Sequence, residues 1–242
     1  MSVTAILVLV LFCTGASFVQ RVTGFGFGIF IMTVLPFIMP SYAEATALSG
    51  LLALVNSFYL TVYYRRIIPW RKLLPILLTF ILVSFLAVSV VARVDSHTLR
   101  RILGVILILV SIWFFCFSER VHLSASLPVQ LTMGTASGLM GGFFAMQGPP
   151  AVLYFMSCTK TKEEYAALAQ AFFFFGNVAM TLFRFRQGFL TRAVCVGWVY
   201  AVVAVFVGLW LGTLVFNRMP LRVLRKVVYA YIGVSGIAAI LT

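Results

Sequence analysis

Two glycine-rich segments are the parts of this sequence whose residue types and spacing could do chemistry. The first is Gly24-Phe25-Gly26-Phe27-Gly28. The second contains Gly141-Gly142 and then Gln147-Gly148-Pro149-Pro150. Both lie in long apolar runs, where closely spaced glycine and proline predict an interrupted helix. A helix that begins inside a membrane presents unpaired N–H groups and the positive end of its dipole, and together these features make an anion site.

The same glycines could instead let two helices pack closely, as small residues four apart do in membranes. The glycines of the first segment are two residues apart, a spacing that does not place them on one helix face. Gly134, Gly138 and Gly142 are four residues apart and fit a packing ridge. We therefore predict a broken-helix site at the first segment and keep both interpretations for the residues before Gln147.

Four polar residues are candidate contributors to such a site. Arg21 adjoins the first segment and would supply a fixed positive charge, because a planar guanidinium suits sulfonate or carboxylate geometry. The alternative is an arginine that extends to a membrane interface. Gln147, Asn56 and Asn177 are neutral donors that could complete the site without adding charge. Their alternative role is interhelical hydrogen bonding, worth about 0.6 kcal/mol on average.

The composition requires membrane-spanning helices to hold these residues. Of 242 residues, 63% are hydrophobic and 10% are charged, whereas soluble domains are about half apolar and a quarter charged. Unbroken apolar runs of about 20 residues favour helices over the alternating strands of a barrel. We predict an all-α integral membrane protein. Full spans are expected at 45–64, 73–92, 99–117, 165–183, 193–216 and 221–241, and glycine-broken elements at 3–39 and 131–156.

The two glycine-rich segments begin two halves of the chain that can be aligned. The aligned pairs are Gly24 and Gly138, Gly28 and Gly142, Met32 and Met146, Pro36 and Pro150, Asn56 and Asn177, and Arg71 and Arg192. Matched proline, asparagine and arginine are harder to obtain by chance in an apolar chain than matched leucine, so an internal duplication is favoured. We assign residues 1–118 to a first transmembrane repeat, 119–128 to a linker and 129–242 to a second repeat.

The basic residues predict how the halves are oriented. The net charge is +13, from 18 Lys and Arg against 5 Asp and Glu. If every apolar element crossed the membrane, the two faces would carry nearly equal basic charge, against the positive-inside tendency. If each glycine-broken element enters and leaves on one face, the basic residues concentrate on one side. We therefore predict inverted repeats, each a re-entrant hairpin plus three transmembrane helices, with both termini outside the cytoplasm.

Other classes of function lack support in the sequence. No basic-aromatic module for nucleic acid occurs, and the basic residues suit topology and contact with membrane lipids. The four cysteines are isolated, without the spacing of a metal site or a disulfide framework. Motifs of metalloproteases, nucleophile elbows and phosphate loops are absent. We expect neither an enzyme nor a bound cofactor or metal.

The glycine segments also carry a family resemblance. Gly24-Phe25-Gly26-Phe27-Gly28 followed by Pro36, and Gly138-x-x-Gly141-Gly142 followed by Gly148-Pro149-Pro150, resemble the two signature segments of the TauE/SafE sulfite-exporter family. The resemblance runs over essentially the whole chain, although Ala145-Met146-Gln147 stands where such families often have a further glycine pair. It implies a multi-pass permease of the bacterial inner membrane that moves small sulfur anions such as sulfite or sulfonates.

The expected function is a secondary transporter of a small anionic solute. The solute would bind between the hairpins near the midplane while one helix bundle rocks against the other. Acidic residues are too few to define an internal relay, so protons remain one candidate coupling ion beside uncoupled transport. A homo-oligomer is a candidate assembly. The alternatives are a membrane-embedded accessory protein that binds a partner, and an anion channel without carrier kinetics.

Overall fold

The computed structural model describes residues 2–91, 93–117, 124, 126–216, 234, 237 and 240, and every element in these ranges is helical. The elements are α1 (Val3–Thr23), α2 (Phe27–Ile31), α3 (Leu35–Ile38), α4 (Tyr42–Tyr64), η1 (Arg65–Ile67), α5 (Trp70–Val91), α6 (Ser96–Phe117), α7 (Leu127–Phe144), α8 (Gly148–Cys158), α9 (Lys162–Arg186) and α10 (Arg192–Phe216). Most of the predicted linker 119–128 and most of the predicted last span 221–241 lie outside the described residues.

Six of the described helices are long and apolar enough to cross a membrane, which confirms the prediction of an all-α, multi-pass membrane protein. They are α1, α4, α5, α6, α9 and α10. Large apolar side chains cover their outer faces: Leu7 and Leu11 on α1, and Leu78 and Leu82 on α5, are each more than 60% exposed. Lipid is the solvent that such a surface fits, because in water it would drive association.

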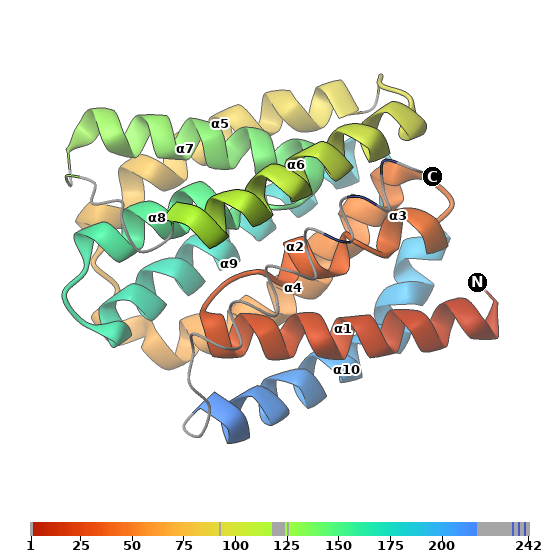
Figure 1. Ribbon diagram of the computed structural model, residues 1–242, viewed down its shortest axis with the longest axis horizontal. Coiled ribbons are helices and arrows are strands. Elements are labelled where there is room, and N and C mark those ends of the chain that lie inside the picture. The colour runs from red at the N-terminus through yellow and green to blue at the C-terminus, as the bar shows by residue number, and fades with distance from the viewer. Residues whose placement is uncertain are drawn as a thin grey trace.

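Five of these six spans, together with α7, form a row in which each helix packs against the next. The order of contact is α1, α10, α4, α9, α5 and α7. Figure 1 shows α1 and α10 at the bottom and α5 and α7 at the top, with α4 and α9 between them. These two central helices are the most buried of the six spans. Each begins with a side-chain cap, in which Ser41 accepts from the Glu44 N–H and Thr161 from the Glu164 N–H.

The first glycine segment ends α1 and turns the chain back along it. Gly24 and Gly26 have φ values of 85° and 103°, which side chains with a Cβ rarely adopt, so the helix stops here. α2 then runs back beside α1, because the Phe30 ring lies 5.9 Å from the Phe12 ring and against Gly15. α1 itself has 21 residues and can cross a membrane alone. The broken element therefore consists of one full-length helix followed by two short ones.

The second break makes a similar reversal without glycine at the turn. α7 ends where Ala145 adopts the left-handed conformation (φ 55°), which costs roughly 1–2 kcal/mol for a residue with a Cβ. α8 begins with Gly148 and two prolines, whose fixed φ suits a first helical turn. It returns along α7, because Gln130 near the start of α7 donates to the Tyr154 hydroxyl at 2.7 Å.

The glycines of α7 form the packing ridge that was one of the two sequence interpretations. A Cβ at Gly134 would lie 2.8 Å from Ile76 O, and a Cβ at Gly138 would lie 2.8 Å from Val83 Cβ, both on α5. Gly142 is in the same row and packs against Ala87 of α5. The backbones of α7 and α5 are therefore in close contact, as small-residue spacing predicts for membrane helices.

The two breaks also revise the alignment of the halves. The sequence alignment pairs Gly24 with Gly138, but the left-handed residue that ends the helix is Gly24 in one half and Ala145 in the other. The structural correspondence is thus two helical turns further along α7. The four-residue glycine repeat of α7 explains the difference, since it allows an alignment to shift by whole turns. Asn56 and Asn177 have the same sequence separation as Gly24 and Ala145, so their pairing agrees with the breaks.

Candidate functional site

The helix break that follows α1 is in direct contact with the helix break that follows α7. Gly28 of α2 packs so closely on the carbonyl oxygen of Ala145 that there is no space between them for a Cβ. Residues of both breaks line one cavity together with α1, α4 and α9. The lining residues are Gln20, Gly26, Phe27, Gly28, Ile29, Ala53, Ala145, Met146, Gln147, Gly148, Phe173 and Asn177. The cavity volume is about 20 Å³, which is room for about one water molecule.

About half of the site residues expected from the sequence line this cavity. They are Gly26, Phe27, Gly28, Gln147, Gly148 and Asn177. The first turns of α2, which has only five residues, and of α8 border the same space, so the positive end of the α8 dipole lies next to it. None of the lining side chains is ionised. The local field at the cavity therefore comes from backbone dipoles and side-chain amides.

A pair of buried glutamines that is not predicted from the sequence holds the first break. Gln20 Oε1 accepts from the Phe27 N–H at 3.3 Å, and Gln20 Nε2 donates to Gln170 Oε1 at 3.2 Å. Gln170 Nε2 donates in turn to Gly24 O at 2.9 Å. Two backbone groups freed by the break thus gain partners from α1 and α9, as a non-helical backbone at membrane depth requires. The sequence signal that could have revealed this pair is a glutamine within each of two membrane-spanning helices.

Gln147 is the polar side chain of the second break. Its Nε2 donates to Phe173 O at 3.4 Å, and its Oε1 has no hydrogen-bond partner among the described residues. Gly176 of α9 provides the space for this amide, because a Cβ there would lie 2.7 Å from Oε1. A buried acceptor without a donor costs about 1–3 kcal/mol, so this group is positioned to bind a further molecule in the cavity.

The two asparagines have different surroundings. Asn177 lines the cavity from α9 and is 4% exposed. Asn56 of α4 is fully buried, and its Oδ1 accepts from the Ser17 hydroxyl of α1 at 2.7 Å. Its Nδ2 has no partner within the part of the chain that the structure describes. Asn56 therefore makes the interhelical hydrogen bond that was its alternative role, and still has donor capacity left.

Arg21 lies outside the lining of the cavity. Its Nε donates to Thr213 Oγ1 of α10 at 3.0 Å, and the side chain is half-buried. A Cβ at Gly212 would lie 2.8 Å from Arg21 Cβ, so α10 packs directly over this part of α1. Arg21 adjoins the first break in sequence, but its guanidinium is directed to the α1–α10 contact.

The other expected site residues surround the cavity without lining it. Gly24 accepts the Gln170 bond, Phe25 packs 3.7 Å from the Cβ position of Gly148, Gly141 O accepts from an arginine, Gly142 packs on α5, and Pro149 lines a separate groove. These residues shape the two breaks and hold them against neighbouring helices.

The arginine bonded to Gly141 is Arg184 of α9, a buried charge that the sequence predicts only as a topology determinant. Its side chain is 1% exposed, and Nη2 donates to Gly141 O at 3.1 Å. Nε and Nη1 have no partner in the described ranges, where Lys72 and Glu164 form the one ion pair. Arg184 lies in the last turn of α9, where an arginine normally extends to the membrane interface, but here the side chain is enclosed by protein. Such a group marks a functional position by default.

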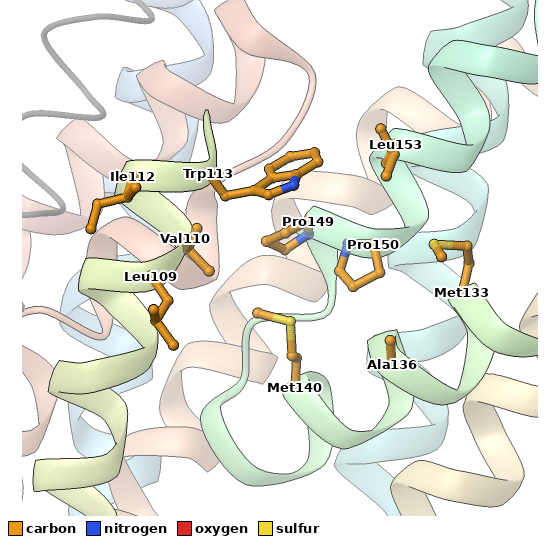
Figure 2. A pocket seen from close by; sticks show the side chains of 10 residues that line it. All are labelled: Leu109, Val110, Ile112, Trp113, Met133, Ala136, Met140, Pro149, Pro150 and Leu153. Carbon is orange, nitrogen blue, oxygen red and sulfur yellow. The ribbon is translucent and has the colours of Figure 1, made fainter. Parts of the chain in front are cut away.

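A second and larger hollow is apolar. α6, α7 and α8 form a groove of about 520 Å³, and Figure 2 shows Trp113 of α6 above Pro149 of α8, with Met140 of α7 below. The lining residues are Leu109, Val110, Ile112, Trp113, Met133, Ala136, Met140, Pro149, Pro150 and Leu153. Nearly all of this surface is hydrocarbon or thioether. An anion gains nothing here, so the candidate functional site is the small polar cavity.

These features define a multi-pass helical membrane protein in which two interrupted helices enclose a polar cavity, an arrangement found in membrane transporters. The family model described as "Sulfite exporter TauE/SafE" matches residues 7–239, so the chain belongs to this family of transporters, which confirms the resemblance. The chain is also similar to the "Probable sulfite/organosulfonate exporter TauE" of Cupriavidus necator. The two are 25% identical over 200 residues, which is 81% of this chain and 78% of the relative. No solved structure matches the chain.

Proposed function

We propose that this protein is a secondary transporter that moves a small sulfur oxyanion or organosulfonate through the cavity between the two helix breaks. The observation that carries the proposal is the contact between the breaks, where the starts of α2 and α8 border one polar cavity. At α8 the attraction for an anion comes from the helix dipole and the Gly148 N–H, because Pro149 and Pro150 carry no N–H. The substrate class rests on membership of the TauE/SafE family and on the name of the relative from Cupriavidus necator.

The order of the helices supports inverted repeats. The equivalent helices of the two halves are α1 and α7, α4 and α9, and α5 and α10. In the row α1, α10, α4, α9, α5 and α7, the members of each pair lie at equal distances from the centre, as a two-fold relation between the halves requires. In Figure 1 the chain enters α1 from the right and α7 from the left. We assign residues 1–118 and 129–242 to two repeats of opposite orientation, each with one re-entrant hairpin, and place both termini outside the cytoplasm.

The size of the cavity supports alternating access. Room for about one water is too little for an oxyanion of four or more heavy atoms. The breaks must therefore separate before the anion enters, and Gly28 and Ala145 form the contact that opens. Movement of the hairpins against α4 and α9 would expose the cavity to each face in turn. A channel would need a continuous wet path, so the small cavity favours a carrier.

Flux measurements test this function. The purified chain in liposomes should exchange labelled sulfite or a small sulfonate with saturation and counterflow, and an imposed pH gradient decides whether protons are coupled. Flux that rises linearly with concentration and shows no counterflow would indicate a channel. If no member of a panel of small anions crosses, the transport proposal is refuted and an accessory role is favoured.

A further inference from the structure

Arg184 carries a positive charge that no described side chain neutralises. Its guanidinium is buried, and Nε and Nη1 have no hydrogen-bond partner among the described residues. Glu44 accepts from Thr191, and Glu164 pairs with Lys72 at the opposite end of α9 from Arg184. A buried charge is normally paired, because taking it out of water is costly. An anion that visits Arg184 would meet this requirement.

The Arg184 guanidinium adjoins residues that line the polar cavity. Arg184 is two turns along α9 from Asn177 and on the same face of the helix. A Cβ at Gly50 of α4 would lie 2.7 Å from Arg184 Nη1 and 4.0 Å from Asn177 Oδ1, so both groups reach the same part of α4. On the other side, Arg184 Nη2 bonds Gly141 O, one turn before the second break. Arg184 thus adjoins both the cavity and the break.

Arg184 lies on the side of the cavity nearer to one membrane face. Thr191, just after α9, bonds Glu44 in the first turn of α4, so the end of α9 and the start of α4 lie at the same face. Tyr42 also lies in that first turn and is 1% exposed. The Tyr42 hydroxyl has no hydrogen-bond partner among the described residues. A second buried donor therefore stands on the side of Arg184 away from the cavity.

We infer that Arg184 is a positively charged binding residue on the transport pathway. It binds the oxyanion as the oxyanion passes between the cavity and the membrane face where α9 ends. The inference rests on the proposed transport function and adds the residue that supplies the positive charge. An arginine beside the C-terminal end of α7 would also offset the helix dipole, a purely structural role. The unpaired Nε and Nη1 are a feature that this structural role does not require.

The test compares Arg184→Gln, Arg184→Lys and Gly50→Ala with Arg186→Gln, an exposed arginine of the same helix. Each purified chain is assayed for sulfite counterflow in liposomes and for the rise in Tm that sulfite causes in detergent. Loss of a charge-assisted contact should raise the KM of Arg184→Gln by about tenfold or more and remove the sulfite-dependent rise in Tm. Arg184→Lys should retain part of the affinity, because the charge remains. Arg186→Gln should keep the wild-type KM.

Gly50→Ala tests anion binding in a chain that still contains Arg184. The added methyl group displaces Nη1 while the charge and the Gly141 bond can remain, so the KM for sulfite should rise. If Arg184→Gln does not fold, this variant decides the question. A wild-type KM and a wild-type rise in Tm in Arg184→Gln, or in Gly50→Ala when the former is unfolded, would overturn the inference. A wild-type protein with neither sulfite counterflow nor a rise in Tm would instead overturn the proposed function, and the inference with it.

Discussion

Gly28→Ala tests the contact between the two helix breaks. A Cβ at position 28 would lie within 3.0 Å of the carbonyl oxygen of Ala145, closer than real Cβ atoms come, whereas ordinary contact begins at 3.4 Å. The breaks would have to separate by more than 0.4 Å, the difference between these distances. The neighbouring atoms belong to the backbone of Ala145 and Met146, so no side chain can rotate away.

The expected cost follows from overpacking. Extra methyl groups in a packed interior cost about 1–3 kcal/mol, and a rigid backbone neighbour favours the upper part of this range. Gly148→Ala is the matched control, since it changes the equivalent glycine at the start of α8. Its Cβ would lie 3.7 Å from the rings of Phe173 and Phe25, which is ordinary contact. A tolerated glycine-to-alanine change stabilises by about 0.4–1 kcal/mol.

Thermal unfolding in detergent measures the difference between the two variants. For a chain of this length, each kcal/mol changes Tm by roughly 2–4 °C, so Gly28→Ala should unfold at least about 3 °C below Gly148→Ala. Sulfite flux should also fall in Gly28→Ala, because the closed contact cannot form. Equal Tm values for the two variants would show that the breaks do not meet at Gly28, and the geometry of the site would have to be abandoned.

Three further changes test other parts of the structure. Gln170→Leu removes the donor to Gly24 O and leaves the Gln20 amide without its partner, so stability should fall by about 1–3 kcal/mol; an unchanged unfolding midpoint would contradict the role of the glutamine pair. Asp95→Ala removes the carboxylate that accepts from the Thr98 N–H at 2.8 Å. Because that bond lowers the pKa of Asp95, the wild-type advantage in Tm should be present at neutral pH and disappear as pH falls through the lowered pKa; an advantage that persists in acid would argue against it. Arg21→Lys should leave the KM for sulfite unchanged, because Arg21 lies outside the cavity lining and its Nε bonds Thr213 of α10; a raised KM would show that its planar guanidinium contacts the anion.

Much of the fold follows from the sequence because lipid imposes simple requirements. The predicted spans 45–64 and 193–216 correspond to α4 (Tyr42–Tyr64) and α10 (Arg192–Phe216). A bilayer needs about 20 apolar residues per helix, and this length is readable from composition alone. The first break was also predictable, since Gly24 and Gly26 both have positive φ and glycine adopts that conformation at little cost.

The second break is harder to place because its turn residue has a side chain. Ala145 has no sequence signal for a left-handed conformation, although its N–H bonds Gly141 O and the Met146 N–H bonds Met140 O to close the end of α7 there. The glycines before Ala145 pack against α5. Because they resemble the glycines of the first segment, a sequence alignment pairs Gly24 with the wrong turn of α7. Sequence spacing reveals a helix face, but it does not reveal which neighbouring helix occupies that face.

The buried polar groups show the same limit. Arg184 is two residues from the exposed Arg186 in the last turn of α9, so the sequence favours an interface position for both. In the sequence, Gln20 is a polar residue between an apolar run and Arg21. Their roles become clear only when α4, α7 and α9 enclose Arg184 and when Gln170 reaches across to Gln20. Such contacts join residues far apart in the chain, which a single sequence does not pair.

The central claim is that the anion passes between the two helix breaks, and Gln147 is the lining residue that tests it most directly. In a chain whose native cysteines are replaced, Gln147→Cys should react with N-ethylmaleimide during transport, because the breaks must separate. A transported alkanesulfonate, which does not react with the reagent, should slow this labelling as it occupies the cavity. Labelling at the same rate with and without the sulfonate, in a variant that still transports it, would place the pathway elsewhere and contradict the account.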